Sequence, residues 1–557
     1  MKIKNIVILI FYLICPSLSL FNHSAKASDF VDSLMDESTD SFLSRNKNLL
    51  VYPVKEVTKQ KRFSYGSIPR KAFLMGFVSL VMSSAFHTAV CQNDNSKHSN
   101  LPLIRQSRVA IIGGGLSGLT MGHRLKQKGY QNIAVYEAKS RVGGRVHTVY
   151  VKNNGGTYSM AELGGHSITD GGDAEHFLNL TKELGLEIED DPRCLSRGFY
   201  ANGKLYDSKE LLRTSGFTQE KLSEILQTLP RSACSMADVI DYVFAENPLL
   251  KRVFTYHVGS YEGLPTKNLA IFHNIETFKF FLPGGKAAFQ ETKGTDEPFV
   301  LRYVKGGNSR LPLALAGALE GRVFLNKALR RVSRYEGGIK LEFTDNTTSF
   351  CDKLILSIPC STFKDIIWED SLLSKERLDE MHQVEYGANG KIVVPLDASS
   401  RKPNYSSVTA DHIGTLENND YKLLVFFTDG VWGKSLNKNL KHYYPSITEM
   451  VEANYGKQQD LQSEPVTVSE ELYSRYDKPI VKSWAEDPYA QGSYSAVGTM
   501  LGSRFLEKTE IRGIPFKAMF TPINDEIFFI GEHTSVIEEM GSMEAAVESA
   551  ERQARLF

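Results

Sequence analysis

The feature that most constrains this fold is a short apolar strand that runs directly into three spaced glycines. Within residues 107–118, Gly113, Gly115 and Gly118 have the spacing G-x-G-x-x-G, with Ser117 in the same turn. In such a turn the first glycine permits the tight bend, the second lets the backbone approach a ligand, and the third lets a helix pack on the strand. A polar Ser117 at the helix start is assigned to the same site.

The residues on either side complete this pattern. The segment Leu116–Lys128 has helical periodicity, and a second apolar run, Asn132–Tyr136, ends at the acid Glu137. A helix N-terminus offers unpaired N–H groups to phosphates, and an acid after the second strand accepts ribose hydroxyls. The sequence therefore predicts a dinucleotide site, and the alternative is a glycine-rich turn in an α/β domain.

The next stretch indicates which dinucleotide binds. Residues 137–145 read E-A-K-S-R-V-G-G-R, which resembles the E-x-x-x-R-x-G-G-R stretch of flavin amine oxidases. The resemblance assigns Arg141, Gly144 and Arg145 to the FAD diphosphate, because backbone donors and guanidinium groups both match an anion of that shape. FAD is therefore favoured over NAD. The alternative for the two arginines is a pair of solvated loop charges.

Later segments resemble further parts of the same cofactor domain. Residues 162–165 match the acid-x-Gly-Gly motif near the flavin ring, which assigns Gly164 and Gly165 to the cofactor. Residues 305–312 match a G-G-x-x-x-L-P segment that opens a helix, and the resemblance places the backbone of Val332 against the adenine.

The C-terminal segment resembles the family as closely as the glycine-rich segment at residues 107–145 does. A strand at residues 527–530 meets Gly531 and Glu532, which by resemblance reach the ribityl-diphosphate. A helix follows within residues 541–550, and its N-terminal end, with Met543, is expected to face the flavin pyrimidine. A positive helix end there stabilises negative charge on reduced flavin.

This succession identifies residues 104–557 as similar to the flavin-containing amine oxidases. The resemblance implies an α/β fold in which an FAD-binding Rossmann-like domain is assembled from separated segments, residues 104–190, 301–365 and 481–557. Residues 191–300 and 366–480 are expected to form a second, mixed-sheet (α+β) substrate domain. Residues 1–103 lie outside the resemblance and are interpreted as an export or targeting region with a linker.

Lys391 is the first of three residues assigned to the chemistry. It follows a glycine-containing stretch and begins an apolar strand. Taken alone it reads as a lysine at a strand edge in solvent. The family's G-x-x-x-K pattern instead places it near flavin N5 through a water, where its charge favours oxygen reduction.

Trp484 and Tyr494 are the other two. Residues 484–495 resemble the family's W-x-x-x-P-x-x-x-G-x-Y segment, in which Tyr494 lines the amine site against the flavin face. The alternative for Tyr494 is an ordinary core residue, although an aromatic ring face suits an amine. Ser493 stands where covalent members have a flavin-linking cysteine, so the FAD is expected to be noncovalent.

Two departures from the family bear on the substrate. The second aromatic of the amine cage is expected just before Met543, where this chain has Gly541 and Ser542. Amino-acid oxidases of the superfamily place Met-Arg after the acid-x-Gly segment, and that arginine binds the substrate carboxylate. Here Gly165 and His166 occupy those positions, and His166 is interpreted as structural.

The chain has 65 Lys and Arg residues and 65 Asp and Glu residues, so nothing in its charge favours a nucleic-acid partner. The N-terminal region instead resembles targeting signals. Lys2 and Lys4 precede an apolar run and a small-x-small motif, as in a secretory signal. A second run, residues 72–91, follows Arg70 and Lys71 and resembles a twin-arginine export signal. Export to the periplasm or medium is predicted, and a membrane-tethering helix is the alternative.

The cysteines do not form a disulfide framework. Cys351 and Cys360 flank an extended strand that would hold them beyond disulfide reach. The sequence leaves open whether Cys194 and Cys234 pair, and no cluster of cysteines or histidines suggests a metal.

The function that follows from the resemblance is an oxidase that transfers hydride from an amine to flavin N5. The imine then hydrolyses to aldehyde and ammonia, and O₂ is reduced to hydrogen peroxide. One alternative is an L-amino acid oxidase whose carboxylate partner is Arg197 or Arg302. Another is an exported FAD-binding protein without oxidase activity. The amine and the oligomeric state are left open.

Overall fold

The computed structural model describes residues 106–153, 155–168, 173–190, 196–202, 204–280, 302–395, 405–409, 414–419, 423–428, 430–455, 465–538 and 540–557. The residues from Leu101 to Phe557 form one compact unit. The predicted targeting segments and Cys194 lie outside the described residues. In the part of the chain that is described, no helix has the length and apolar character needed to cross a membrane.

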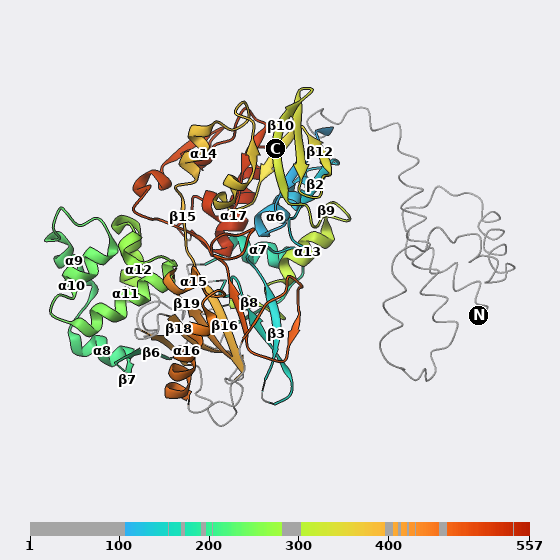
Figure 1. Cartoon of the computed structure of the whole chain (residues 1–557). Helices are drawn as coiled ribbons and strands as arrows, with labels where there is room; N and C mark the ends of the chain where they lie inside the picture. Colours follow the sequence, from blue (N-terminus) through green and yellow to red (C-terminus); the bar gives the residue numbers. More distant parts are fainter. Residues whose placement is uncertain are drawn as a thin grey trace, which may run out of the picture. The chain divides into compact units, whose positions relative to one another are not determined.

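A five-stranded parallel sheet carries the glycine-rich turn (Figure 1). Its strands, in spatial order, are β26 (Ile527–Phe529), β13 (Lys353–Leu356), β1 (Val109–Ile112), β2 (Ile133–Tyr136) and β9 (Val323–Phe324). All of the pairings are parallel. Because parallel strands end at the same edge, the turns after β1, β13 and β26 meet there, although they are far apart in the sequence.

Both faces of this sheet are covered, as its apolar strands require. Val109 and Ile111 of β1 pack into one buried cluster, together with apolar residues of the helices. Ala110 and Ile112 point the other way, into a second cluster. The strand therefore separates two hydrophobic cores.

Helices cover the first face. They are α6 (Leu116–Gln127), α7 (Glu175–Glu183), α13 (Arg310–Ala318) and α17 (Met543–Ala554). Helices α6 and α17 lie against each other near the centre of Figure 1, although more than half of the chain separates them. The predicted helix after the glycines is thus present, and its N-terminal part lies directly on β1.

A layer that is antiparallel except for one short parallel pair covers the second face. Its strands are β12 (Thr348–Cys351), β11 (Gly338–Phe343) and β10 (Leu329–Tyr335), with the short β14 (Ile367–Trp368) parallel beside β10. The turn at Asp345 and Asn346 joins β11 to β12, and Asn346 has a φ of 65°. Cys351 and Cys360 are buried and not disulfide-bonded.

An eight-stranded mixed sheet forms the second large layer. In order its strands are β20 (Val466–Thr467), β22 (Ile480–Ser483), β16 (Gly390–Pro395), β19 (Leu423–Thr428), β18 (Gly414–Asn419), β17 (Tyr405–Thr409), β6 (Ser196–Ala201) and β7 (Lys204–Asp207). The pairs β20–β22 and β17–β6 are parallel, and the other pairs are antiparallel.

Helices accompany this sheet, and several of them group together in green in Figure 1. They are α8 (Ser208–Ser215), α9 (Gln219–Gln227), α10 (Met236–Val243), α11 (Pro248–Glu262), α12 (Ile271–Phe280), α15 (Gly430–Gly433) and α16 (Leu440–Tyr455). Buried residues of α10, α11 and α12 share one apolar cluster. The two kinds of sheet confirm the predicted α/β class, whereas the exact domain boundaries stay a prediction.

The remaining described strands and the remaining α-helix are short. They are β3 (Thr148–Lys152), β4 (Tyr158–Glu162) and β21 (Arg475–Tyr476) in one sheet; β5 (Ile188–Asp190) with β8 (Arg302–Val304); β15 (Glu385–Tyr386) with β23 (Ser495–Ala496); β24 (Lys508–Ile511) with β25 (Ile514–Lys517); and helix α14 (Lys375–Met381).

The packing of α6 on β1 yields a stability prediction. A Cβ on Gly118 would lie 2.0 Å from the carbonyl oxygen of Gly113. Gly118→Ala should therefore lower the free energy of unfolding by about 1–3 kcal/mol, since the helix must move off the strand. Chemical denaturation of the purified variant measures this change.

Gly317→Ala is the matched control. Gly317 lies near the end of α13, and its added Cβ would meet nothing within 4 Å. Alanine should leave stability unchanged or raise it by up to about 1 kcal/mol. Equal stabilities of the two variants would contradict the close approach at Gly118.

Candidate active site

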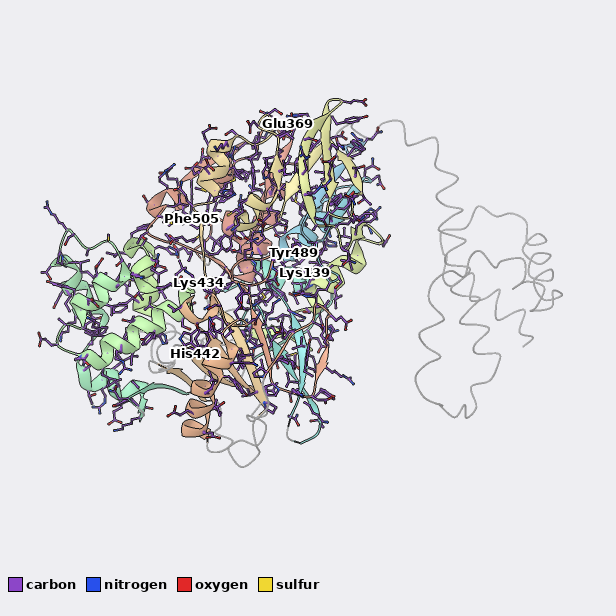
Figure 2. The ribbon with its side chains drawn as sticks, in the orientation of Figure 1. Lys139, Glu369, Lys434, His442, Tyr489 and Phe505 are labelled. Atoms are coloured by element: carbon purple, nitrogen blue, oxygen red, sulfur yellow. The ribbon has the colours of Figure 1, made fainter. Side chains whose placement is uncertain are left out.

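One cavity of about 1050 Å³ runs from the glycine-rich turn to helices α11 and α12. Lys139 and Tyr489, labelled in Figure 2, are among its lining residues. Most of the predicted site residues also line it: Gly113, Gly115, Ser117, Glu137, Gly144, Arg145, Gly164, Gly165, Glu532, Met543, Lys391, Trp484 and Tyr494.

The turn between β1 and α6 leaves room for a ligand at one glycine. Gly113 has a φ of 108°, a conformation that favours glycine, and its backbone packs against Ser357 and Ile358. A Cβ on Gly115 would instead meet nothing within 4 Å. Gly115 is also the N-cap of α6, which has no side-chain cap. The first N–H groups of the helix therefore suit a phosphate, and the site fits the diphosphate of FAD.

Glu137 lies at the end of β2 and faces this turn. Its carboxylate accepts hydrogen bonds from the backbone N–H groups of Gly114 at 2.7 Å and Lys139 at 2.9 Å. Burial raises the pKa of Glu137, and the two N–H groups oppose that rise. The acid thus fixes the loop that follows it, in addition to lining the cavity where a ribose is expected.

Arg145 and Glu532 connect two distant segments at the cavity wall. Nη1 of Arg145 donates to Oε1 of Glu532 at 2.8 Å and to the carbonyl oxygen of Ser493 at 3.0 Å. Glu532 also accepts from the N–H and hydroxyl of Ser495. Burial opposes ionisation of Glu532, but Arg145 holds its pKa below the ordinary value. Glu532 therefore orients Arg145 beside the expected diphosphate.

Four predicted cofactor residues do not line the cavity, namely Gly118, Arg141, Val332 and Gly531. Gly118 faces Gly113, and Gly531, with a φ of 124°, donates its N–H to Ser549. Val332 is buried in β10, whereas the cavity wall there consists of residues 327–330. Gly118 and Gly531 have packing roles, and the contact of the Val332 backbone with the adenine stays a prediction.

Arg141 also differs from its prediction of direct diphosphate contact. Its Nε donates to Glu470 at 3.0 Å, and its Nη1 donates to the carbonyls of Val142 and Val146. Only 3% of Arg141 is exposed, and it does not line the cavity. Arg141 therefore lies on the side of the loop away from the cavity, and its hydrogen bonds to the two carbonyls hold the backbone around Gly143 and Gly144 in place.

Lys139, which the sequence analysis did not single out, joins a buried charge network. The network consists of Lys139, Arg141, Glu470, Lys482 and Asp487. Asp487 accepts from both lysines, with Lys482 Nζ at 2.7 Å. Burial opposes its ionisation, yet the two lysines lower the pKa of Asp487 to about 2. The position of Lys139, two residues after Glu137, is the sequence signal that could have indicated it.

Trp484 connects this network to the catalytic end of the cavity. The ammonium groups of Lys139 and Lys482 lie 5.7 and 4.6 Å from the centre of its ring. Its indole N–H donates to the carbonyl oxygen of Leu163 at 2.8 Å. A Cβ on Gly164 would lie 3.2 Å from the ring and 1.7 Å from the carbonyl oxygen of Arg145, so the ring packs closely on this glycine. Trp484 therefore fixes the acid-x-Gly-Gly segment beside the expected flavin.

Lys391, near the start of β16, lies inside the cavity wall. Its Nζ donates to the carbonyl oxygens of Glu162 and Gly164, each at 2.9 Å, and its side chain is largely buried. The ammonium lies 5.8 Å from the centre of the Phe427 ring. The strand-edge alternative is thus excluded, because this lysine faces the same segment as Trp484.

Tyr494 faces the cavity from the loop before β23. Its hydroxyl donates to the carbonyl oxygen of Tyr261 in α11, which fixes the ring. A Cβ on Gly541 would lie 3.1 Å from that ring, and Gly541 also lines the cavity. Gly541 therefore packs directly against the Tyr494 ring and contributes no aromatic side chain to the cavity.

Ser493 hydrogen-bonds within the protein. Its hydroxyl donates to Oδ1 of Asn389 at 2.7 Å, and Asn389 donates in turn to the carbonyls of Ser260 and Thr428. His166 lines the cavity, and its carbonyl oxygen accepts from Asn308 at 2.6 Å. No catalytic role follows for His166 from these contacts.

The turn, the acid and the buried lysine at the far end of one cavity define a dinucleotide-dependent oxidoreductase. The model of the family "Flavin containing amine oxidoreductase" matches residues 116–556, and the chain belongs to this family. Its members act on CH–NH bonds with a flavin cofactor, so the predicted enzyme class and flavin are confirmed.

Individual relatives are distant. The L-amino-acid oxidase of Siganus canaliculatus is 22% identical, over 84% of this chain and 89% of the relative. Amine oxidase [flavin-containing] A of Sus scrofa is 26% identical, over 80% and 84%. A solved structure of putrescine oxidase bound to putrescine has a TM-score of 0.59 at 18% identity, covering 81% of this chain and 98% of that one. At these identities the structures support the fold.

The open position at Gly115 yields a prediction about the cofactor. Gly115→Val should fold but be purified without FAD, because the side chain would fill the space that the diphosphate needs. The ratio of flavin to protein absorbance measures occupancy, and circular dichroism confirms folding. Gly317→Val, at a position that does not line the cavity, should retain FAD. A Gly115→Val protein with full FAD content would contradict the assignment.

Proposed function

We propose that this protein is an FAD-dependent oxidase of an amine that needs no α-carboxylate. The substrate, O₂ and water would yield an aldehyde, ammonia and hydrogen peroxide, through an imine that hydrolyses. The observation that carries the proposal is the single cavity, in which the diphosphate cradle continues to Lys391 and Tyr494. Bound FAD would supply the hydride acceptor, flavin N5, and would pass both electrons to O₂.

The protein itself would orient the amine and keep water away. Tyr494 offers a ring face held by its hydrogen bond to Tyr261, and Phe427 adds a second aromatic surface beside Lys391. Such faces attract an amine through contact with the ring. The two carbonyls that bind Lys391 fix its ammonium, so its positive charge is in place when negative charge develops.

The arginines of the cavity wall support an amine over an amino acid. Among the described lining residues the arginines are Arg145, which is paired with Glu532, and Arg330 in β10, on the adenine side. Arg302 pairs with Asp190 at 3.4 Å and does not line the cavity. The side chain of Arg197 lies outside the described residues. L-amino acid oxidation stays the alternative.

The noncovalent state of FAD and export are parts of the same proposal. Ser493 offers no thiol for a flavin link, and its hydroxyl is engaged by Asn389. Export or membrane tethering rests on the sequence pattern of residues 1–103. An oxidase exported with FAD already bound would have to fold before transport.

Lys391→Met should slow flavin turnover by about tenfold or more, equivalent to about 1.4 kcal/mol of barrier, while FAD stays bound. The lysine acts electrostatically and does not hold the cofactor in this proposal. Stopped-flow absorbance measures reduction by the amine and reoxidation by O₂ separately. Lys434→Met, an exposed lysine outside the cavity wall, is the control. If both half-reactions of Lys391→Met stay within about twofold of wild type, Lys391 has no catalytic role.

The substrate class is tested by pairing each amino acid with its decarboxylated amine. Phenethylamine should reduce the flavin anaerobically about tenfold faster than phenylalanine, or more, because an unpaired carboxylate costs on the order of 1–3 kcal/mol to bury. The opposite order over several pairs would support an L-amino acid oxidase. A flavin that no amine and no amino acid reduces would support a binding protein without oxidase activity.

A further inference from the structure

Two consecutive helices of the substrate region form one wall of the cavity, here called the helical wall. It consists of the cavity-lining residues of α11 and α12: His257, Ser260, Tyr261, Glu262, Phe272, His273, Glu276 and Thr277. The carbonyl oxygen of Tyr261 accepts from Tyr494, so this wall adjoins the place where the reactive amine is expected.

The described groups on and around this wall favour a cation. Glu262 and Glu276 belong to it, and Glu538 lines the cavity from another segment. The basic groups in the same part are His257, His273 and Lys391. Burial, followed by the charge of Lys517, lowers the pKa of His273 and keeps it neutral at pH 7. Lys391 is held by two carbonyls on the opposite side of the cavity.

Glu262 is the carboxyl group best placed to bind such a cation. It is the last residue of α11, and it accepts a hydrogen bond from the hydroxyl of Thr277 in α12. Burial raises the pKa of Glu262 to about 7, and only the Thr277 hydroxyl opposes that rise. No described cation thus compensates this carboxyl group, whereas Glu276 is exposed and paired with Lys279 at 2.7 Å.

A second buried group on the same wall points to a ligand independently. Ser260 is 2% exposed and lines the cavity, yet its hydroxyl has no hydrogen-bond partner among the described residues. Burying a polar group without a partner is unfavourable. A polar substrate group in the cavity would satisfy this hydroxyl.

We propose that the helical wall binds a second cationic group of the substrate, with the Glu262 carboxylate as its partner and the Ser260 hydroxyl as a separate polar contact on the same wall. The substrate would then be a terminal diamine or a longer polyamine, with one amine at Lys391 and Tyr494 and the distal ammonium at Glu262. This inference rests on the proposed amine oxidation. Binding of a positive charge would also keep Glu262 ionised, so the distal ammonium and the carboxylate stabilise each other.

The test compares each diamine with the monoamine in which a methyl group replaces the distal ammonium. Putrescine is paired with pentylamine, and cadaverine with hexylamine, on the FAD-loaded enzyme. Anaerobic stopped-flow at several concentrations gives an apparent Kd and a limiting rate of flavin reduction. In the wild type at least one diamine should bind about tenfold more tightly than its monoamine, or better, as expected for a charge-assisted contact.

Glu262→Gln should remove this preference, because the amide keeps the shape and loses the charge. The apparent Kd of the diamine should rise about tenfold, with the limiting rate and the monoamine Kd nearly unchanged. Glu276→Gln is the matched control and should leave the preference within about twofold, since that carboxylate is exposed and already paired. This split between binding and rate separates recognition by Glu262 from a structural role.

The wild-type comparison decides the matter even if Glu262→Gln does not fold. Monoamines that bind as tightly as every diamine, with normal flavin reduction, would overturn the inference and leave the amine oxidase intact. Retention of the diamine preference in a folded Glu262→Gln protein would overturn the role of Glu262. A flavin that neither class of substrate reduces would contradict the proposed function itself.

Discussion

The site depends on the parallel pairing of β1 with β2 on one side and with β13 on the other. These backbone hydrogen bonds, continued from β13 to β26, join segments that lie hundreds of residues apart. Because all of these strands end at one edge, the glycine turn, Glu137, Ser357 and Glu532 meet around a single space. The close approach of α6 at Gly118 holds the first helix against that edge. Without this parallel pairing, the residues expected to bind the FAD diphosphate would not come together at one end of the cavity.

The second half of the cavity is fixed by contacts to backbone carbonyls. Lys391, Trp484 and Tyr494 each donate to a carbonyl oxygen, of Glu162 and Gly164, of Leu163 and of Tyr261 respectively. Carbonyl acceptors keep their position and their partial charge at any pH, so these side chains are held without further titrating groups. The same arrangement leaves Glu262 and Ser260 on the helical wall without such compensation. The two sides of the cavity thus differ, because the Ser260 hydroxyl has no hydrogen-bond partner and the Glu262 carboxyl no cation among the described residues.

The fold and the FAD-binding part of the cavity were predictable from local sequence. Glycine spacing, strand length and the acid after the second strand, Glu137, are all signals within a short stretch of chain. Gly115, Glu137 and Arg145 line the cavity for the reasons their motifs suggest. Arg141 and Val332 were harder, since a motif fixes the position of a residue in the chain but not which side of a loop it faces. The burial of Lys391 was read from the resemblance, because its own strand pattern equally fits a solvent edge. Glu262 carries no motif, and only the packing of α12 against α11 brings Thr277 to it.

The buried charge network has a consequence for how this sequence can change. Lys139, Arg141 and Lys482 bring more positive charge than Glu470 and Asp487 neutralise, and all of these side chains except Glu470 are almost fully enclosed. Removing one partner leaves another charge stranded, whereas exchanging the members together for apolar residues of similar volume need not be costly. The five residues should therefore change together in evolution. Replacing one of them should destabilise the protein until a second replacement removes the charge left without a partner. Divergent relatives would then carry either the whole set or a wholly different one at these positions.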